Sequence, residues 1–226
     1  MAIFDAIRKA VLRTTGDQIN EVFASSMQVA AEMADLSNEV AAEIVAYHPW
    51  RRLTKVATLD GAQGESYDLP ADYDRMAGDI DDPSTWFWGY SAFNDVNEYL
   101  QFKTGGFLLA GNGGWIILGG KLEFYPAPSS GASFPYISNA YAQDEDGAPK
   151  SEFTADNDTF VLPDRLLTLG LVWRWKAQKG LEYSEDLATF QTALDQEATR
   201  DRGYYTLKSP RNRFDAPMAY SGRAIR

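Results

Sequence analysis

The stretch from residue 161 to residue 180, VLPDRLLTLGLVWRWKAQKG, constrains the fold more than any other part of the chain. It has a proline near its first turn and Gly180 just past its end, an asymmetry that is typical of a helix. Its unbroken length of about seventeen residues also favours a helix over a strand. In a helix Trp173 and Trp175 point to different sides, because positions two apart lie about 200° apart around the axis. We therefore expect a helix that is apolar most of the way round and buried on most of its sides.

Helical patterns lie on both sides of this stretch in the sequence. The N-terminal fifty residues predict two helices, and the first has a stripe of Ile3, Phe4, Ile7, Val11 and Leu12 that Gly16 ends. The second begins near Ser25 or Ser26, with a capping box from Ser25 to Gln28, and it stops at His48-Pro49, because a residue before proline avoids helical geometry. After Gly180, YSEDLATFQTALDQEATRDRG predicts a helix that forms a hairpin with residues 161–180.

The sequence between about residues 53 and 141 has the texture of a β-rich region. LTKVATL and SYDLP, separated by the turn signal DGAQG, predict a hairpin. WIILGGKLEFYP is the firmest hairpin, because Gly119-Gly120 tolerates the positive φ that such turns require. TWFWGY predicts a strand with Trp86, Trp88 and Tyr90 on one face.

Three further segments complete this region. SAFNDVNEYLQF predicts a short helix, with Ser91 as its cap. ASFPYISNAY predicts a strand, and its Pro135 indicates an edge position, because proline cannot donate to a ladder. The acidic stretch QDEDGAPKSE predicts a solvated loop.

The fold class that we predict is α+β, a helical bundle with an inserted antiparallel β-rich domain and an extended C-terminal arm. The predicted divisions are 1–52 with 160–203 for the bundle, 53–142 for the β-rich insert, 143–159 for an acidic loop and 204–226 for the arm.

Charge is distributed unevenly along the chain. The formal net charge is −11, which argues against a general nucleic-acid binder, because phosphate contacts need clustered basic residues. Residues 200–226 carry a net charge of +5, so the other 199 residues carry −16. The most apolar window, GFLLAGNGGWIILGG, is shorter than the roughly 20 residues of a membrane span. We expect a soluble protein that makes no contact with a membrane.

Large apolar side chains alternate with basic ones after Gly203, without the period of a helix or a strand. Aromatic residues, Met and Arg are enriched at protein interfaces, so this pattern favours an arm that orders on a partner over a purely solvated terminus. The predicted docking residues are Tyr204, Tyr205, Lys208, Arg211, Arg213, Phe214, Met218, Tyr220, Arg223 and Arg226.

Residue types for most catalytic and metal sites are missing. Cysteine is absent and His48 is the single histidine, so a catalytic triad or a metal site built on His or Cys lacks its partners. We expect His48 to be a capping or partly buried residue. A pair of carboxylates remains available, as in glycosidases, but the candidates lie in acidic runs that are usually solvated. These candidates are Asp72, Asp74, Asp79, Asp81 and Asp82.

Several segments resemble the head–tail adaptor proteins of tailed bacteriophages, which join the portal ring to the tail. The matching pieces run in order along about half of the residues. They are AAEIVAYHPWRRLTKVAT, YDLPADYDRM, KLEFYPAP and FTADNDTFVLPDRLLTLGLVWRWKAQKGLEYSEDLATF, the last being the most specific.

The resemblance implies a structural protein of the virion, without catalytic activity, cofactor or metal, which is assembled in the host cytoplasm and located at the head–tail junction. It implies a ring of subunits, commonly twelve, whose C-terminal arms reach onto the portal protein. The ring would then receive the next tail component, a nozzle, tail-tube or stopper protein, and genomic DNA would pass through without specific binding. Within such a ring we expect Trp86, Trp88 and Trp175 at contacts between subunits.

Two alternatives stay open from the sequence. One is a carbohydrate- or cell-wall-acting enzyme of the phage tail, in which Trp86 and Trp88 stack on sugars beside two carboxylates. The other is a tail or baseplate structural protein that does not contact the portal.

Overall fold

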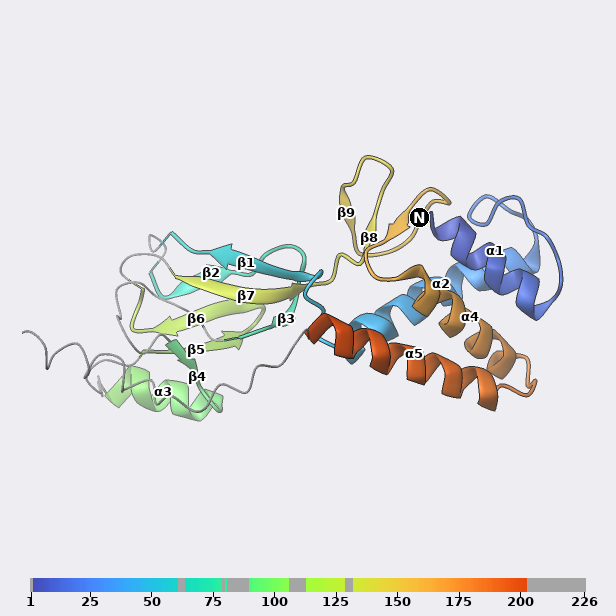
Figure 1. The fold of residues 1–226 in the computed structure, drawn as a ribbon. Coiled ribbons are helices and arrows are strands. Elements are labelled where there is room, and N and C mark those ends of the chain that lie inside the picture. Colours follow the sequence, from blue (N-terminus) through green and yellow to red (C-terminus); the bar gives the residue numbers. More distant parts are fainter. Residues whose placement is uncertain are drawn as a thin grey trace, which may run out of the picture.

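The computed structural model describes residues 2–60, 64–78, 80, 90–105, 113–128 and 132–202. They form an α+β fold, as predicted, in which α1, α2, α4 and α5 gather at one end and most strands, with α3, gather at the other (Figure 1). The helices are α1 (Ile3–Thr14), α2 (Gln28–Tyr47), α3 (Val96–Gly105), α4 (Asp164–Gln178) and α5 (Ser184–Arg202).

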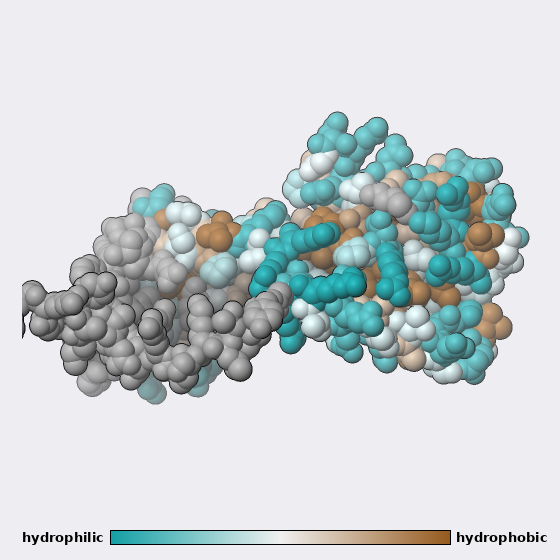
Figure 2. Space-filling model, in the orientation of Figure 1, coloured by the Kyte–Doolittle hydropathy of each residue, from teal (hydrophilic) through white to brown (hydrophobic). Residues whose placement is uncertain are grey.

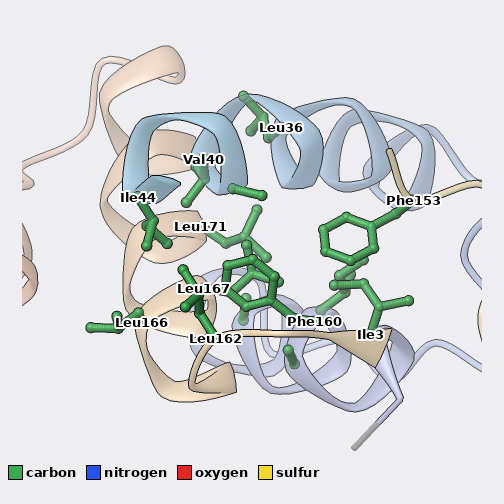
Figure 3. Packing of buried hydrophobic residues seen from close by; sticks show 14 of the residues in the cluster. Ile3, Leu36, Val40, Ile44, Phe153, Phe160, Leu162, Leu166, Leu167 and Leu171 are labelled. Atoms are coloured by element: carbon green, nitrogen blue, oxygen red, sulfur yellow. The ribbon is translucent and has the colours of Figure 1, made fainter. Parts of the chain in front are cut away.

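Helix α4 is the central element of the helical part, in contact with α1, α2 and α5. Leu166, Leu167 and Leu171 are fully buried, and Figure 3 shows Leu167 and Leu171 packed among Val40 and Ile44 of α2. A fully buried leucine contributes roughly 1.5–3 kcal/mol to folding. The predicted helix, buried on most of its sides, is therefore confirmed.

The two tryptophans of α4 do point apart. The Trp173 ring packs against Phe190 of α5, with ring centroids 6.1 Å apart. Trp175 lies on another side, under the ammonium of Lys179 at 5.7 Å from its ring centroid. Both indoles are only 7 % exposed, so α4 buries large aromatic surfaces in two directions.

The ends of α1 and α2 confirm two predictions and overturn one. Gly16, with a φ of 78°, follows α1, and α2 ends at Tyr47, directly before the extended His48. The predicted capping box at Ser25 is wrong. The N-cap position of α2 is Met27, and Ser25 instead accepts a hydrogen bond from the Met27 N–H in the preceding turn.

The exposed face of the helical part includes several residues of the predicted stripes. Leu12, in the last turn of α1, is 54 % exposed, and Tyr47, the last residue of α2, is 51 % exposed. For α5 the sequence predicts an apolar stripe of Tyr183, Leu187, Phe190 and Leu194, and the structure buries Phe190 and Leu194 but leaves Tyr183 39 % exposed.

Among the described residues, the strands form three small sheets with the orders β1-β7-β3, β2-β6-β5-β4 and β10-β8-β9. The hairpin of β5 and β6 is confirmed, and its turn residues Gly119 and Gly120 have φ angles of 58° and 80°. The strands are β1 (Thr54–Thr58), β2 (Ser66–Asp68), β3 (Tyr73–Met76), β4 (Tyr90–Ala92), β5 (Gly113–Leu118), β6 (Lys121–Tyr125), β7 (Ser133–Ser138), β8 (Ala142–Gln143), β9 (Pro149–Lys150) and β10 (Thr159–Phe160).

The predicted hairpin of LTKVATL with SYDLP is wrong. Both segments contain strands, but β1 pairs with β7 and β2 pairs with β6, so the two strands belong to different sheets. An alternating pattern defines which face of a strand is buried, and it does not define the partner strand. The partners come later in the sequence: β7 for β1, and β6 for β2.

Pro135 lies in the central strand of its sheet, and its predicted edge position is therefore wrong. The Pro135 carbonyl accepts a hydrogen bond from the N–H of Ala77, directly after the end of β3. The N–H and C=O of one strand residue point to the same side. The missing donor of Pro135 thus points to the side where β3 has ended, so the ladder tolerates proline there.

The short helix after β4 is confirmed, and its cap is different from the predicted one. Ser91 belongs to β4, whereas the Asp95 carboxylate accepts a hydrogen bond from the Glu98 N–H at 2.7 Å. Glu98 in turn accepts from the N–H of Asn94 at 2.7 Å. Asp95 therefore caps the start of α3, and Glu98 holds the residue before the cap.

The acidic stretch after β8 is exposed and more ordered than a loop. β8 and β9 form a hairpin that projects from the molecule (Figure 1), with a turn at Gly147, which has a φ of 83°. The next residues turn inward: Phe153 and Asp158 are each 2 % exposed. The Asp156 carboxylate accepts hydrogen bonds from the N–H groups of Val22 and Phe23, which fastens this segment to the loop between α1 and α2.

Candidate functional site at the end of the last helix

The predicted site residues fall mostly outside the described part of the chain. This applies to Trp86, to Trp88 and to all ten predicted docking residues of segment 204–226. Trp175 is described, and within a single chain it is covered by its surroundings near Glu32 of α2. Its place in a subunit interface stays a prediction.

The described residue that leads into segment 204–226 is Arg202, at the end of α5, so the surroundings of this helix end form the candidate site. We call residues 48–52 together with the last turn of α5 the α2–α5 junction. In Figure 2 hydrophilic residues cover the visible face of the molecule where α5 ends.

A compact turn shapes residues 48–52 directly after α2. The Trp50 N–H donates to the His48 carbonyl at 2.9 Å, and the Leu53 N–H donates to the Trp50 carbonyl at 3.0 Å. The Trp50 indole is 2 % exposed and donates to the carbonyl of Ile44 at 2.8 Å. Because the last carbonyls of a helix lack partners within the helix, Trp50 caps α2 and fixes the course of the chain that follows.

Asp201 is the residue at which this turn meets α5. Its Oδ2 atom lies 3.3 Å from Nε2 of His48 and accepts a hydrogen bond from the Arg51 N–H at 2.9 Å. His48 is 4 % exposed and packs edge-on against Trp50, with ring centroids 5.1 Å apart. The Arg51 guanidinium donates to the carbonyl of Arg202. His48 is therefore buried, as the sequence led us to expect, and its ring lies beside the Asp201 carboxylate.

Two further arginines connect the junction to the rest of the molecule. Nη2 of Arg75, on β3, donates to the carbonyls of Val45 at 3.0 Å and His48 at 3.3 Å, at the negative end of the α2 dipole. Nη1 of Arg52 donates to the carbonyl of Val161, just before α4, at 3.2 Å. The segment after α2 therefore contacts a sheet, the start of α4 and the end of α5.

A cavity of about 260 Å³ opens beside the junction. Its lining combines two arginines, two acids and an apolar wall, and consists of Trp50, Arg52, Leu162, Pro163, Glu197, Arg200 and Asp201. The guanidinium of Arg200 is paired with Glu197 within the same helix at 2.7 Å. The mixed charge suits a protein contact more than a substrate site that needs one sign of charge.

The described candidates for acid–base chemistry have structural partners. Burial would raise the pKa of Asp72, but hydrogen bonds from Lys55, Ser138 and Tyr136 outweigh it and lower the pKa to about 2. A carboxyl with that pKa is ionised at neutral pH and is poorly suited to act as a general acid. Asp74 pairs with Arg75 at 2.6 Å.

The remaining possibilities for an active site are three further carboxylates and a metal centre. Asp79, Asp81 and Asp82 lie outside the described part of the chain. Within that part, no three His, Asp or Glu side chains gather as a metal site, and no helix is long and apolar enough to span a membrane.

The model of the SU10 adaptor protein family matches residues 2–218. The chain belongs to this family. The match covers the four bundle helices, the sheets, the α2–α5 junction and the first part of segment 204–226. A comparison with curated proteins gives no match. The protein is thus a phage adaptor, a structural protein of the virion, and the sequence resemblance to head–tail adaptors is confirmed.

Of the junction residues, the sequence indicates only that His48 caps a helix or is partly buried. It does not indicate that His48 and Arg51 meet Asp201, which is about 150 positions away. The one available signal was the position of Asp201 itself, since an acidic residue in the last turn of a helix opposes the helix dipole and needs a partner elsewhere.

Proposed function

We propose that this protein forms a ring at the head–tail junction, docks on the portal protein through residues 204–226, and provides the platform for the next tail component. The observation that carries the proposal is the family match, which extends through most of the C-terminal segment. Copies in a ring, commonly twelve, bind together, so modest affinity of each segment adds up to stable attachment.

The distribution of charge supports this role. The C-terminal part from residue 200 carries +5 and the remainder of the chain carries −16. A basic segment suits docking onto an acidic assembly, since complementary charge sets orientation and encounter rate. The acidic remainder would repel DNA, so that the genome passes through the ring without binding to it.

In this proposal the protein is not an enzyme, and it acts by assembly in the host cytoplasm and then in the virion. The bundle of 1–52 and 160–203, the β-rich insert 53–142 and the acidic segment 143–159 form the ring, with Trp86, Trp88 and Trp175 at contacts between subunits. The ten predicted docking residues of segment 204–226 contact the portal.

Deletion of the gene from its phage tests the proposed function. We expect heads with portals that lack tails and lose their DNA, and we expect a plasmid copy of the gene to restore tailed particles. Tailed, infectious virions without the protein would contradict the adaptor role. Intact particles that fail only to degrade the cell wall would point to the enzyme instead.

A further inference from the structure

The last turn of α5 is unusually well fastened for a helix end. The final four carbonyls of a helix have no partner within it, and terminal turns commonly fray. Here the Arg202 carbonyl accepts from the Arg51 guanidinium, and two turns earlier the Tyr47 hydroxyl donates to Asp195. The last residues of α5 are thus attached to the end of α2 at several points.

Asp201 carries a negative charge at a position where its own helix destabilises one. A negative charge in the last turn of a helix is repelled by the helix dipole. The Asp201 side chain is only 15 % exposed, and its partners are His48 and the backbone of Arg51, both outside α5. Its energetic benefit therefore comes from the junction between α2 and α5 rather than from the helix in which it lies.

We propose that Asp201 is a positioning residue for portal docking: it fixes the point and direction at which the C-terminal segment leaves the body. The inference rests on the proposed docking of residues 204–226. A segment whose base is already fixed loses less conformational freedom when it binds, so its affinity is higher. Asp201 acts through the junction and does not itself touch the portal.

The test compares Asp201→Asn with Glu185→Gln in the full-length protein. Both variants replace an acid by its amide on α5, but Glu185 is exposed in the first turn of the helix, away from the α2–α5 junction and the cavity beside it. We expect Asp201→Asn to weaken binding to the isolated cognate portal ring about tenfold, because its contacts with His48 and the Arg51 N–H then involve a neutral amide instead of a charged carboxylate. Glu185→Gln should bind within about twofold of the wild type.

Two measurements on the free protein separate positioning from folding. The melting temperature of Asp201→Asn should stay within a few degrees of the wild type, while amide hydrogen exchange of residues 198–202 becomes faster.

Arg51→Ala serves as a second variant, since Arg51 is exposed and its guanidinium reaches the Arg202 carbonyl. We expect about threefold weaker portal binding for it. If Asp201→Asn does not fold, Arg51→Ala decides.

The outcomes distinguish this inference from the proposed function. If the wild type binds the portal and both junction variants bind equally well, the positioning role of Asp201 is wrong and the adaptor role stands. If the wild type itself does not bind, the proposed docking fails and the inference fails with it. Weaker binding by both junction variants, with the Glu185→Gln control unchanged, supports the inference.

Discussion

The Nε2 atom of His48 lies 3.3 Å from the Oδ2 atom of Asp201 and so joins the ends of two helices that are far apart in the sequence. The single histidine of the chain is 4 % exposed and has a structural partner. The contact lies in the α2–α5 junction, directly before the basic C-terminal segment in the sequence.

Replacing His48 should destabilise this junction. His48→Ala removes an imidazole that packs against Trp50 and lies 3.3 Å from the mostly buried Asp201 carboxylate, so we expect the free energy of unfolding to fall by about 1–3 kcal/mol. Urea denaturation followed by tryptophan fluorescence measures it. Thr189→Ala, on the exposed face of α5, is the control and should change stability by less than about 0.5 kcal/mol. An alanine variant at position 48 as stable as this control would show that the contact is dispensable.

Gly170 of α4 packs tightly against Val40 of α2. A Cβ atom at this position would lie 2.3 Å from Cγ1 of Val40 and 3.2 Å from a ring atom of Phe190. Gly170→Ala should therefore lower stability by about 1–3 kcal/mol, because overpacking outweighs the gain in helix propensity. Adding Val40→Ala should recover part of the loss by removing the clashing methyl group. A single variant more stable than the wild type would disprove this packing.

Asp158 should contribute more to stability than the exposed acidic residues in the turn of the β8–β9 hairpin. Its carboxylate accepts from Lys150 Nζ at 2.6 Å and from the N–H groups of Thr154 and Ala155 at 2.7 and 3.0 Å. Burial alone would raise its pKa, but these donors lower the pKa. Asp158→Ala leaves these partly buried donors without the carboxylate and should lower the free energy of unfolding by about 3 kcal/mol.

The matched control for Asp158 is Asp146→Ala, at the exposed turn of the β8–β9 hairpin. It should change stability by less than about 0.5 kcal/mol. Equal effects of the two substitutions would contradict the buried role of Asp158.

Acid should remove the contribution of Asp72. Because its pKa is about 2 in the folded protein and 3.8 ordinarily, its stabilising effect is complete above pH 4 and is lost as the pH falls toward 2. We expect Asp72→Asn to be less stable than the wild type by up to about 2 kcal/mol at pH 7. The gap should close below pH 3, and a constant gap across this range would refute the assignment.

Helices could be predicted from the sequence because their signals are local. The apolar surround of α4, the glycine after α1 and the proline after α2 each act within a few residues. The β5–β6 hairpin was predictable for the same reason, since Gly119-Gly120 joins adjacent strands.

Strand partners and the candidate site could not be predicted, because they depend on contacts across the fold. β1 and β2 alternate as strands do, yet each pairs with a strand more than fifty positions away. The proline rule failed at Pro135 because a neighbouring strand ends beside it. His48 and Asp201 meet only after α2, α4 and α5 have packed, and neither side chain alone indicates the other.

Mass photometry with the isolated cognate portal ring tests the central claim most directly, using the full-length protein and a chain truncated after Gly203. We predict that the full-length protein adds a ring of subunits, each of 25.2 kDa, to the portal, and that the truncated chain adds none. If neither protein adds mass, or if the truncated chain adds as much as the full-length one, docking through residues 204–226 is contradicted.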